Sequence, residues 1–388
     1  MRKVYFYYPS AVHSVDLYKM SLLPDGFEAS GNAYAANPLL KMAHKEKGIR
    51  QGFSRLVYPF ASSLYNNVHI MMGMPKKRAF RLKGFDMVYS SQSLLDTDLP
   101  YVLDMEHPAV FCGFNQYGLD SARFVKALGK ELEKDNLRKI LPMSETARKT
   151  LLNFIKSEKV AGKTETLYPV ANAQQKTKKP EEITFLFVGK NFYEKGGYET
   201  LIAFDQLSKT HDVRLNYLGP VPDMIKEKYS ANKRISFFFN LPYEKVKELY
   251  QNSTCLVFPS KYDTLGFVVI EAFAFGLPAI VVDSFALPEL VEDGKRGIVI
   301  KSPFYSFRKD GGYAWPTMEI AMKERLRLSM NPPEEYIERL YDAMKRMTEN
   351  SSERDEMARN AYNEATEGRF SEKEFRKRIS RIFNDILG

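Results

Sequence analysis

The sequence predicts an α/β protein of two domains, each with a parallel β-sheet between layers of helices. The chain has 388 residues, which is more than a single hydrophobic core usually serves. Short apolar runs alternate with amphipathic helical patterns along both halves, as they do in proteins with parallel sheets. A polar stretch at 171–182 separates the two series and has the composition of a linker. We therefore expect one domain over 1–175 and a second over 183–370.

The second half shows the alternation most clearly. Its apolar runs are continuous rather than interrupted at every second residue, which indicates strands buried on both faces of a sheet. We expect strands at 183–189, 213–219, 235–239, 255–258 and 279–282. We expect helices at 199–209, 222–230, 243–251 and 266–275.

The first half shows the same alternation of apolar runs and helical patterns, and its apolar runs are shorter. Strand candidates lie at 4–8, 87–89, 101–103 and 140–143. The first run stops at Pro9, which is too early for the core of a signal peptide. No stretch approaches the roughly 18 consecutive apolar residues that a membrane-spanning helix needs. We therefore expect a cytoplasmic protein without transmembrane segments.

Composition excludes several classes of protein. Hydrophobic residues make up 44% of the chain and charged residues 27%, which is unlike a disordered protein. The two cysteines, Cys112 and Cys255, are too few and too far apart for a disulfide framework or a metal knuckle. We interpret both as small apolar side chains in a reducing compartment.

The net charge of +9 is concentrated in the first half. Residues 1–175 carry 24 Lys and Arg against 16 Asp and Glu, which is typical either of a solvated surface or of a domain that meets an anionic partner. The basic stretch Met74–Lys83 could contact anionic lipid headgroups or a phosphate-bearing acceptor, or could be a solvated loop. No module that combines aromatic and basic residues for nucleic acid is present, so we expect no nucleic-acid partner.

The C-terminal stretch Glu372–Leu387 predicts an amphipathic helix with basic residues on its polar face. Such a helix can lie on a membrane, or its apolar face can pack on a domain. We favour packing, and any membrane contact would then be peripheral.

Two loops in the second half carry the chemistry. The first, Gly189–Gly197 (GKNFYEKGG), follows an expected strand and places Lys190 and Lys195 between glycines. Glycine lets the backbone approach a ligand closely, and two ammonium groups can hold a diphosphate. Ligands of open parallel sheets bind at the carboxyl ends of strands, so the position suits a binding loop. The alternative interpretation is an exposed basic turn.

The second loop follows the strand at 255–258 and leads into the helix expected from about Phe267. Gly266 permits the turn, and the amides at the start of the helix can receive phosphate oxygens. Asp263 lies in the loop, where its carboxylate can accept hydrogen bonds from sugar hydroxyls. Glu271 lies inside an otherwise apolar helix, where a carboxylate is costly without partners. The paired hydroxyls of a ribose would serve; the alternative is a side chain that points to solvent.

With both loops in view, the second half resembles the donor domain of glycosyltransferase family 4, the retaining enzymes of the GT-B fold (glycosyl transferases group 1). The family's phosphate loop reads Gly-Arg, four residues, Lys-Gly; Gly189-Lys190 and Lys195-Gly196 match it, with Lys for Arg. Its signature is an acidic residue, usually Glu, then seven residues and a Glu, which Asp263 and Glu271 match. Leu287–Val299 fits the run that follows. The resemblance covers 183–300 well and 1–175 only in its strand–helix rhythm.

The resemblance implies roles for these residues. Lys190 and Lys195 would bind the donor diphosphate, Glu271 the ribose and Asp263 the transferring sugar, and the Gly266 and Phe267 amides would support the sugar and phosphates. Lys190 cannot reproduce the forked, bidentate grip of a guanidinium. Asp263 is one methylene shorter than the usual Glu, which changes its reach.

The resemblance also implies a fold: two facing Rossmann-like domains with parallel sheets, and a C-terminal helix at 371–388 that crosses back to the first domain. That first domain would bind the acceptor. Many relatives carry a His after one of its strands, and here either Glu106 or His107 would take that place near the transferring sugar. The Gly-Gly turn that often follows the first strand is replaced by Pro9–Ser14.

We therefore predict a hexosyltransferase that uses a nucleotide diphosphate sugar (a UDP- or GDP-sugar), with a lipid, saccharide or other acceptor. No Asp-x-Asp motif is present and histidines are few, so we expect neither a metal requirement nor a cofactor. One alternative is a GT-B sugar-nucleotide epimerase, which normally needs more acid and base side chains around the sugar. Another is a scaffold that binds a nucleotide sugar without turnover.

Overall fold

The computed structural model describes the whole chain except residues 10–13, 32–67, 116, 175–181 and 316–317. The described chain forms two compact units. The N-terminal unit consists of Met1–Pro169, Lys309–Gly312 and Phe375–Gly388. The C-terminal unit consists of Val170–Arg308 and Tyr313–Glu374. The centre of the expected linker, and most of the turn at Pro9–Ser14, lie outside the described residues.

The N-terminal unit is built on a five-stranded parallel sheet in the order β2-β1-β4-β6-β7. Strands β4 and β6 are buried along their whole length, which explains their apolar composition. The strands are β1 (Arg2–Tyr7), β2 (Phe27–Gly31), β4 (Met87–Ser91), β6 (Tyr101–Met105) and β7 (Leu137–Pro142), with a separate small sheet of β3 (Lys77–Ala79) and β5 (Leu94–Asp96). The four strands expected in this half are present; β2 was not expected because its sequence, FEASG, is short and has polar residues at Glu28 and Ser30.

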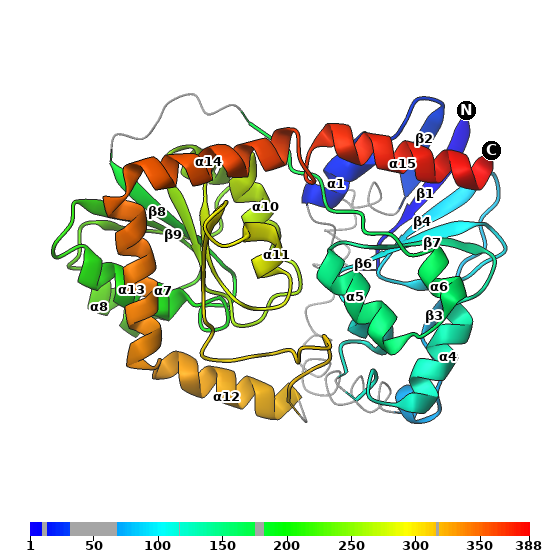
Figure 1. Cartoon of the computed structure of the whole chain (residues 1–388), viewed down its shortest axis with the longest axis horizontal. Coiled ribbons are helices and arrows are strands. Elements are labelled where there is room, and N and C mark those ends of the chain that lie inside the picture. The colour runs from blue at the N-terminus through cyan, green and yellow to red at the C-terminus, as the bar shows by residue number, and fades with distance from the viewer. Residues whose placement is uncertain (10–13, 32–67, 116, 175–181, 316–317) are drawn as a thin grey trace, which may run out of the picture. The chain divides into compact units, whose positions relative to one another are not determined.

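Three helices of the N-terminal unit begin after serines that cap them. The hydroxyls of Ser121, Ser144 and Ser157 each accept a hydrogen bond from a backbone N–H of the first helical turn. The helices are α1 (Ser14–Ser21), α4 (Ala122–Leu132), α5 (Glu145–Phe154) and α6 (Glu158–Gly162), with a 3₁₀ helix η1 at Pro108–Cys112 (Figure 1).

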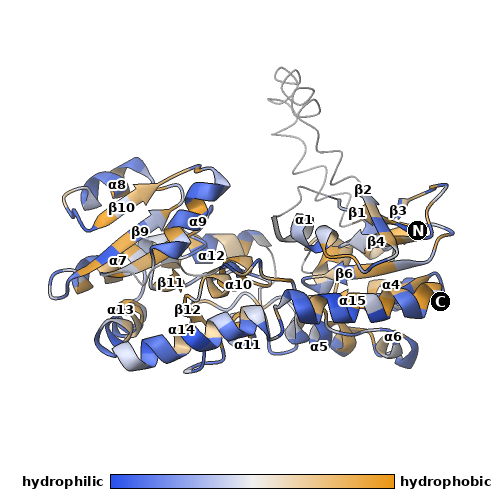
Figure 2. Cartoon of the chain, turned by 90° about the horizontal axis from the view of Figure 1, so that it is seen from above, coloured by the Kyte–Doolittle hydropathy of each residue, from blue (hydrophilic) through white to orange (hydrophobic). Residues whose placement is uncertain are grey.

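The C-terminal unit has a six-stranded parallel sheet in the order β10-β9-β8-β11-β12-β13. The pairing of β8 with β9 runs from Ile183 opposite Val213 to Val188 opposite Leu218. The strands are β8 (Ile183–Val188), β9 (Val213–Leu218), β10 (Ile235–Phe238), β11 (Cys255–Phe258), β12 (Ala279–Val282) and β13 (Gly297–Ile300). The expected strands and helices of 183–282 are all present, and Figure 2 shows the strands as largely apolar.

Helices accompany the strands of this unit and then continue after the sheet is complete. Helices α7 and α13 pack together, as do α10 and α14 (Figure 1). The helices are α7 (Gly197–Leu207), α8 (Asp223–Tyr229), α9 (Tyr243–Gln251), α10 (Phe267–Ala274), α11 (Leu287–Val291), α12 (Met318–Met330), α13 (Glu334–Glu349) and α14 (Ser351–Thr366).

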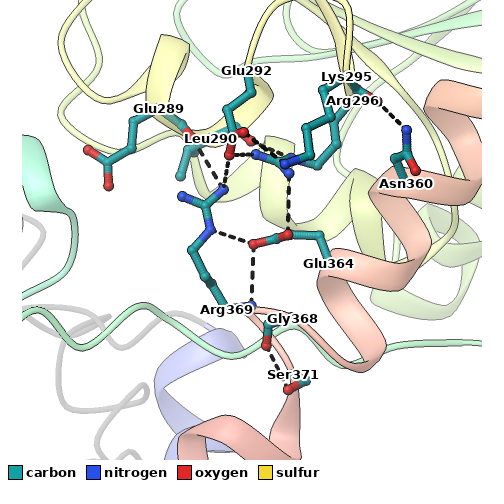
Figure 3. A network of polar contacts seen from close by, with 10 residues as sticks. All are labelled: Glu289, Leu290, Glu292, Lys295, Arg296, Asn360, Glu364, Gly368, Arg369 and Ser371. Carbon is teal, nitrogen blue, oxygen red and sulfur yellow. Dashed lines mark hydrogen bonds and ion pairs between the residues drawn. The ribbon is translucent and has the colours of Figure 1, made fainter.

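A buried arginine ties the last of these helices to the turn before β13. Arg296 is 1% exposed and forms ion pairs with Glu292 and with Glu364 of α14 (Figure 3). Arg369, which follows α14, also pairs with both carboxylates. Two guanidinium groups and two carboxylates therefore satisfy one another, which makes the burial of Arg296 tolerable.

Two segments from late in the sequence belong to the N-terminal unit. The last helix, α15 (Glu372–Leu387), joins it from Phe375 onwards, and its Phe383 ring lies 5.3 Å from that of Phe27. Its buried residues, Phe375, Ile379, Ile382 and Phe383, make up the apolar face seen in the sequence, so that face packs on protein. The short segment Lys309–Gly312 is the second, and no sequence pattern indicated it. No helix in the described ranges is long and apolar enough to cross a membrane.

Candidate functional site

The order in which the chain adds strands to the sheet of the C-terminal unit reverses at β8. From β8 the chain adds β9 and β10 on one side, and it resumes with β11 on the other. The carboxyl ends of β8 and β11 therefore flank the switch point at which open α/β sheets bind ligands. The two loops singled out in the sequence follow these two strands. We call residues 189–196 the β8 loop and residues 259–266 the β11 loop.

Glycine allows the two loops to touch. Gly196 has a φ of 79°, and a Cβ at this position would lie 2.5 Å from the carbonyl oxygen of Pro259. The carbonyl of Glu194 accepts a hydrogen bond from the backbone N–H of Lys261 at 3.0 Å. Any larger residue at 196 would separate the loops.

Lys195 joins the loops through its side chain. Its Nζ donates to Asp263 Oδ2 at 2.9 Å and to the carbonyl oxygen of Tyr262 at 2.8 Å. An ammonium group has three N–H donors, so one remains for a ligand. The Lys195 side chain is 20% exposed and that of Asp263 16%, so their charges are less screened than at a fully solvated surface.

The β11 loop delivers the start of α10 to the same place. Asp263 Oδ1 accepts a hydrogen bond from the N–H of Leu265 at 3.1 Å, and Gly266 then turns the chain with a φ of 87°. No side chain caps α10, which leaves its positive dipole end available to an anion. The turn at Gly266 and the start of the helix at Phe267 are as the sequence predicted, and contact of their amides with a ligand stays a prediction.

Glu271 lies one turn into α10 and is half-buried. Its Oε2 accepts a hydrogen bond from the hydroxyl of Tyr250 at 3.1 Å. Burial and the nearby Glu271 carboxylate hold the pKa of Tyr250 well above its ordinary value, so the phenol stays a donor. The sequence predicts that the Glu271 carboxylate needs a polar partner, and the hydroxyl of Tyr250 is one such partner.

The two lysines of the β8 loop are not equivalent. Lys190 is exposed and makes no ion pair or hydrogen bond with the residues that the structure describes, whereas Lys195 is fixed by two contacts. Gly189 precedes Lys190, and a Cβ there would lie 2.9 Å from Cβ of Lys195. Because the Lys190 side chain is exposed, it loses conformational freedom when it binds a ligand.

A buried ion pair lies next to the two loops. Lys261 Nζ bonds Glu199 Oε1 of α7, and both side chains are 0% exposed. Burial raises the pKa of Glu199, although Lys261 opposes this shift. Breaking such a pair leaves an uncompensated buried charge, so it holds the β11 loop to α7.

In the N-terminal unit, Glu106 and His107 follow β6. Glu106 is half-buried, and its Oε1 accepts a hydrogen bond from Gln92 Nε2 at 3.0 Å. Gln92 follows β4 with a φ of 54°, a conformation rare for a residue other than glycine. Glu106 and Gln92 thus form a polar pair at the carboxyl ends of two neighbouring strands.

His107 is completely buried. Its Nδ1 accepts from the N–H of Ala109 at 3.0 Å and so caps η1, and its Nε2 therefore donates to the carbonyl of Gly311 at 2.8 Å. Burial lowers the pKa of His107 to about 4. Of the two predicted alternatives, the structure leaves Glu106 the more accessible and gives His107 backbone partners; contact of either with a sugar stays a prediction.

Sequence reasoning missed several of these contacts. Tyr250 and Lys261 meet their carboxylate partners across 21 and 62 positions, so no local spacing reveals them. Gly311 meets His107 across 204 positions. Glu199 and Lys261 stand beside the loops already singled out, but nothing in the sequence indicates that the two are buried together.

A metal site is not apparent in the described ranges: they contain no group of three or more His, Cys, Asp or Glu side chains placed to hold an ion. Both cysteines are buried, and burial raises the pKa of each thiol to about 12.

Comparison with known proteins gives a family match for part of the chain and similar folds for the whole of it. Residues 171–306 match the family model of the glycosyl transferases group 1. Over its full length the chain is similar to the crystal structure of Anabaena HepE in complex with UDP and glucose, with a TM-score of 0.58, 14% identity, and coverage of 99% of this chain and 100% of HepE. Sucrose-phosphate synthase from Thermosynechococcus elongatus gives a TM-score of 0.62 at 13% identity, covering 100% and 99% of the two chains. The fold is GT-B.

Curated relatives match part of the chain. An uncharacterized glycosyltransferase from Haemophilus influenzae is 31% identical over 226 residues, which are 56% of this chain and 60% of the relative. Across three such relatives the chain spans between 32% and 60% of their length. The GT-B fold predicted from the sequence is thus confirmed.

Proposed function

We propose that this GT-B protein is a retaining glycosyltransferase that transfers a hexosyl group from a nucleotide diphosphate sugar to an acceptor bound by the N-terminal unit. The observation that carries the proposal is the position of Lys195, which Asp263 and Tyr262 hold at the switch point between two glycine-bearing loops. The match to glycosyl transferases group 1 over the same loops supports it.

The proposal assigns the donor diphosphate to the β8 loop and the start of α10. Lys195 has one N–H donor left, and the uncapped end of α10 supplies backbone amides. When the bond between the anomeric carbon and the diphosphate oxygen breaks, negative charge grows on that oxygen. Groups already fixed around it stabilise this charge without reorganising. Lys190 adds a second, mobile charge.

The proposal assigns the sugar to Asp263 and the ribose to Glu271. Both oxygens of Asp263 already accept hydrogen bonds, so we give it a positioning role rather than attack on the sugar. Glu271 Oε2 is held by Tyr250, which orients the carboxylate towards a hydroxyl pair. The acceptor is a lipid, saccharide or other hydroxyl compound at the edge that carries Glu106, and any membrane contact is peripheral. We expect no metal requirement.

The test is an assay for nucleoside diphosphate release from UDP-, GDP- and ADP-sugars, with and without sugar and lipid acceptors and with EDTA present. We expect one donor to be consumed by the wild type and not by Asp263→Asn, and the product to keep the anomeric configuration of the donor. Epimerised or free sugar as the main product in the presence of acceptor would contradict transfer. Binding without turnover of any donor would favour a scaffold.

A further inference from the structure

The family match ends at residue 306, within a segment that returns to the candidate site. This segment comprises 304–315, whose ends pair at Phe307 and Tyr313, and helix α12. We call it the clamp segment. Only its tip, Lys309–Gly312, belongs to the N-terminal unit; the contacts considered below lie in the C-terminal unit.

The clamp segment contacts the β11 loop immediately before Asp263. The hydroxyl of Ser306 donates to the carbonyl of Lys261 at 2.8 Å. The ring of Tyr262 stacks on Phe307 with centroids 5.7 Å apart and planes at 13°, and its hydroxyl lies 3.3 Å from that of Tyr313. The clamp segment therefore contacts the backbone of Lys261 and the side chain of Tyr262.

The same segment contacts the β8 loop immediately before Lys195. Arg325 of α12 lies 3.4 Å from Glu194 Oε2, and its side chain is 6% exposed. The hydroxyl of Ser329, one turn further along α12, donates to the carbonyl of Tyr193 at 3.0 Å. Helix α12 thus fixes residues 193 and 194.

Arg325 reaches both loops through its guanidinium. Besides pairing with Glu194, its guanidinium lies 4.5 Å from the centre of the Tyr262 ring. A planar guanidinium can pair with a carboxylate at its edge and stack on an aromatic ring with its face, which an ammonium cannot do. Its two partners directly precede Lys195 and Asp263 in the sequence.

We propose that Arg325 is a positioning residue for the donor site: by fixing Glu194 and Tyr262 together, it sets the distance between Lys195 and Asp263 and so the grip on the donor's diphosphate. The inference rests on the proposed function. A positioning role differs from a general stabilising role because it predicts that Arg325 variants lose affinity for the diphosphate and keep their affinity for the monophosphate. A nucleoside diphosphate uses the Lys195 grip fully, whereas the matching monophosphate depends mainly on contacts to its base and ribose.

The experiment measures calorimetric affinities of UDP and UMP, GDP and GMP, and ADP and AMP for the wild type and for Arg325→Met. For the pair that binds, we expect the diphosphate to weaken about tenfold to a hundredfold, as misplacement of binding groups by about 1 Å can cause. We expect little change for the monophosphate. Arg325→Lys should recover only part of the loss, because it keeps the charge near Glu194 but not the stacking.

Arg327→Met is the matched control, since Arg327 lies on the same helix but is exposed and pairs only locally with Glu324. It should bind like the wild type. Glu194→Gln tests the same contact from its more exposed side and should reproduce the selective loss if Arg325→Met does not fold. Wild-type affinities in both variants, or equal losses of both nucleotides with a lowered unfolding temperature, would overturn the inference. Failure of the wild type to bind any diphosphate would instead overturn the proposed function, and the inference with it.

Discussion

The two sheet edges of this protein hold their polar side chains in different ways. At the edge of the C-terminal unit, Lys195 and Asp263 come from adjoining loops and bond each other, with one lysine donor left over. At the edge of the N-terminal unit, buried His107 bonds the backbone of Ala109 and Gly311, and the more accessible Glu106 accepts a hydrogen bond from Gln92. The first edge is prepared for an anion, whereas the second offers a carboxylate and an amide that suit hydroxyl groups.

The difference lies partly in where each site sits on its sheet. The β8 loop and the β11 loop follow strands that flank the switch point of their sheet. In the N-terminal unit the equivalent point lies between β1 and β4, and Glu106 follows the next strand, β6. Residues 10–13, between β1 and α1, are outside the described part of the chain, and the comparison concerns β4 and β6.

The largest effect should come from the fixed lysine. Lys195→Ala removes a charge that both loops organise, and we expect donor turnover to fall about 10²–10³-fold. Lys190→Ala is the matched control from the same loop, and its loss should be much smaller because its side chain must be ordered by the ligand. Steady-state rates at saturating donor measure both. Equal losses would show that fixation of Lys195 in the free protein has no bearing on its role.

The second effect tests the assignment of Glu271 to the ribose. Glu271→Ala should lower the affinity for a ribonucleoside diphosphate about tenfold, as expected when one charge-assisted hydrogen bond is removed. It should leave the affinity for the 2′,3′-dideoxy analogue unchanged. Tyr250→Phe removes the hydroxyl that orients Glu271, and it should give a smaller loss with the same selectivity. Calorimetry with the two nucleotides separates this account from a solvent-facing Glu271, for which both would bind as before.

The third effect concerns stability and belongs to the N-terminal edge. Because His107 has a pKa of about 4 when folded and about 6.5 when unfolded, the unfolded chain binds more protons between these values. The neutral ring therefore contributes stability above pH 6.5 that is lost as the pH falls towards 4, at up to about 1.4 kcal/mol per pH unit.

Denaturant unfolding of the wild type and His107→Gln between pH 4 and pH 7 measures this contribution. The difference between their unfolding free energies should shrink as the pH falls. Glu106→Gln serves as the neighbouring control and should not alter this pH dependence in the same window. A pH-independent difference for His107→Gln would contradict the buried, neutral state of the ring.

The smallest effect uses the two cysteines, one in each unit. Cys112 and Cys255 are buried with pKa values of about 12, so neither should react with a thiol reagent in the native protein at neutral pH. In single-cysteine variants, reactivity with increasing denaturant should report the unfolding of each unit separately. Rapid labelling of either thiol without denaturant would contradict its buried position.

The sequence was sufficient to predict the strands and loops that depend on residues close together in the chain. Continuous apolar runs predicted β8 to β12, and glycine next to lysine predicted two loops that the structure brings into contact. It was insufficient where partners lie far apart in the chain. Arg325 pairs with Glu194 from helix α12, which no sequence motif marks. The carbonyl of Gly311 bonds His107 from the opposite half of the sequence.

Domain limits show the same contrast. The stretch at 171–182 is polar, but Ala171 already bonds the carbonyl of Phe370, and the first unit ends at Pro169. The short tip Lys309–Gly312 joins the N-terminal unit through backbone contacts, which leave no trace in composition. Polarity along the chain therefore approximates a boundary, whereas packing fixes it.

The most direct test of the central claim is a calorimetric titration of the metal-free protein with UDP, GDP and ADP, for the wild type and Lys195→Ala. We predict that one nucleoside diphosphate binds the wild type with 1:1 stoichiometry and that Lys195→Ala binds it much more weakly while remaining folded. Absence of binding by all three, or equal affinity in the variant, would contradict a donor site built on the loops that follow β8 and β11.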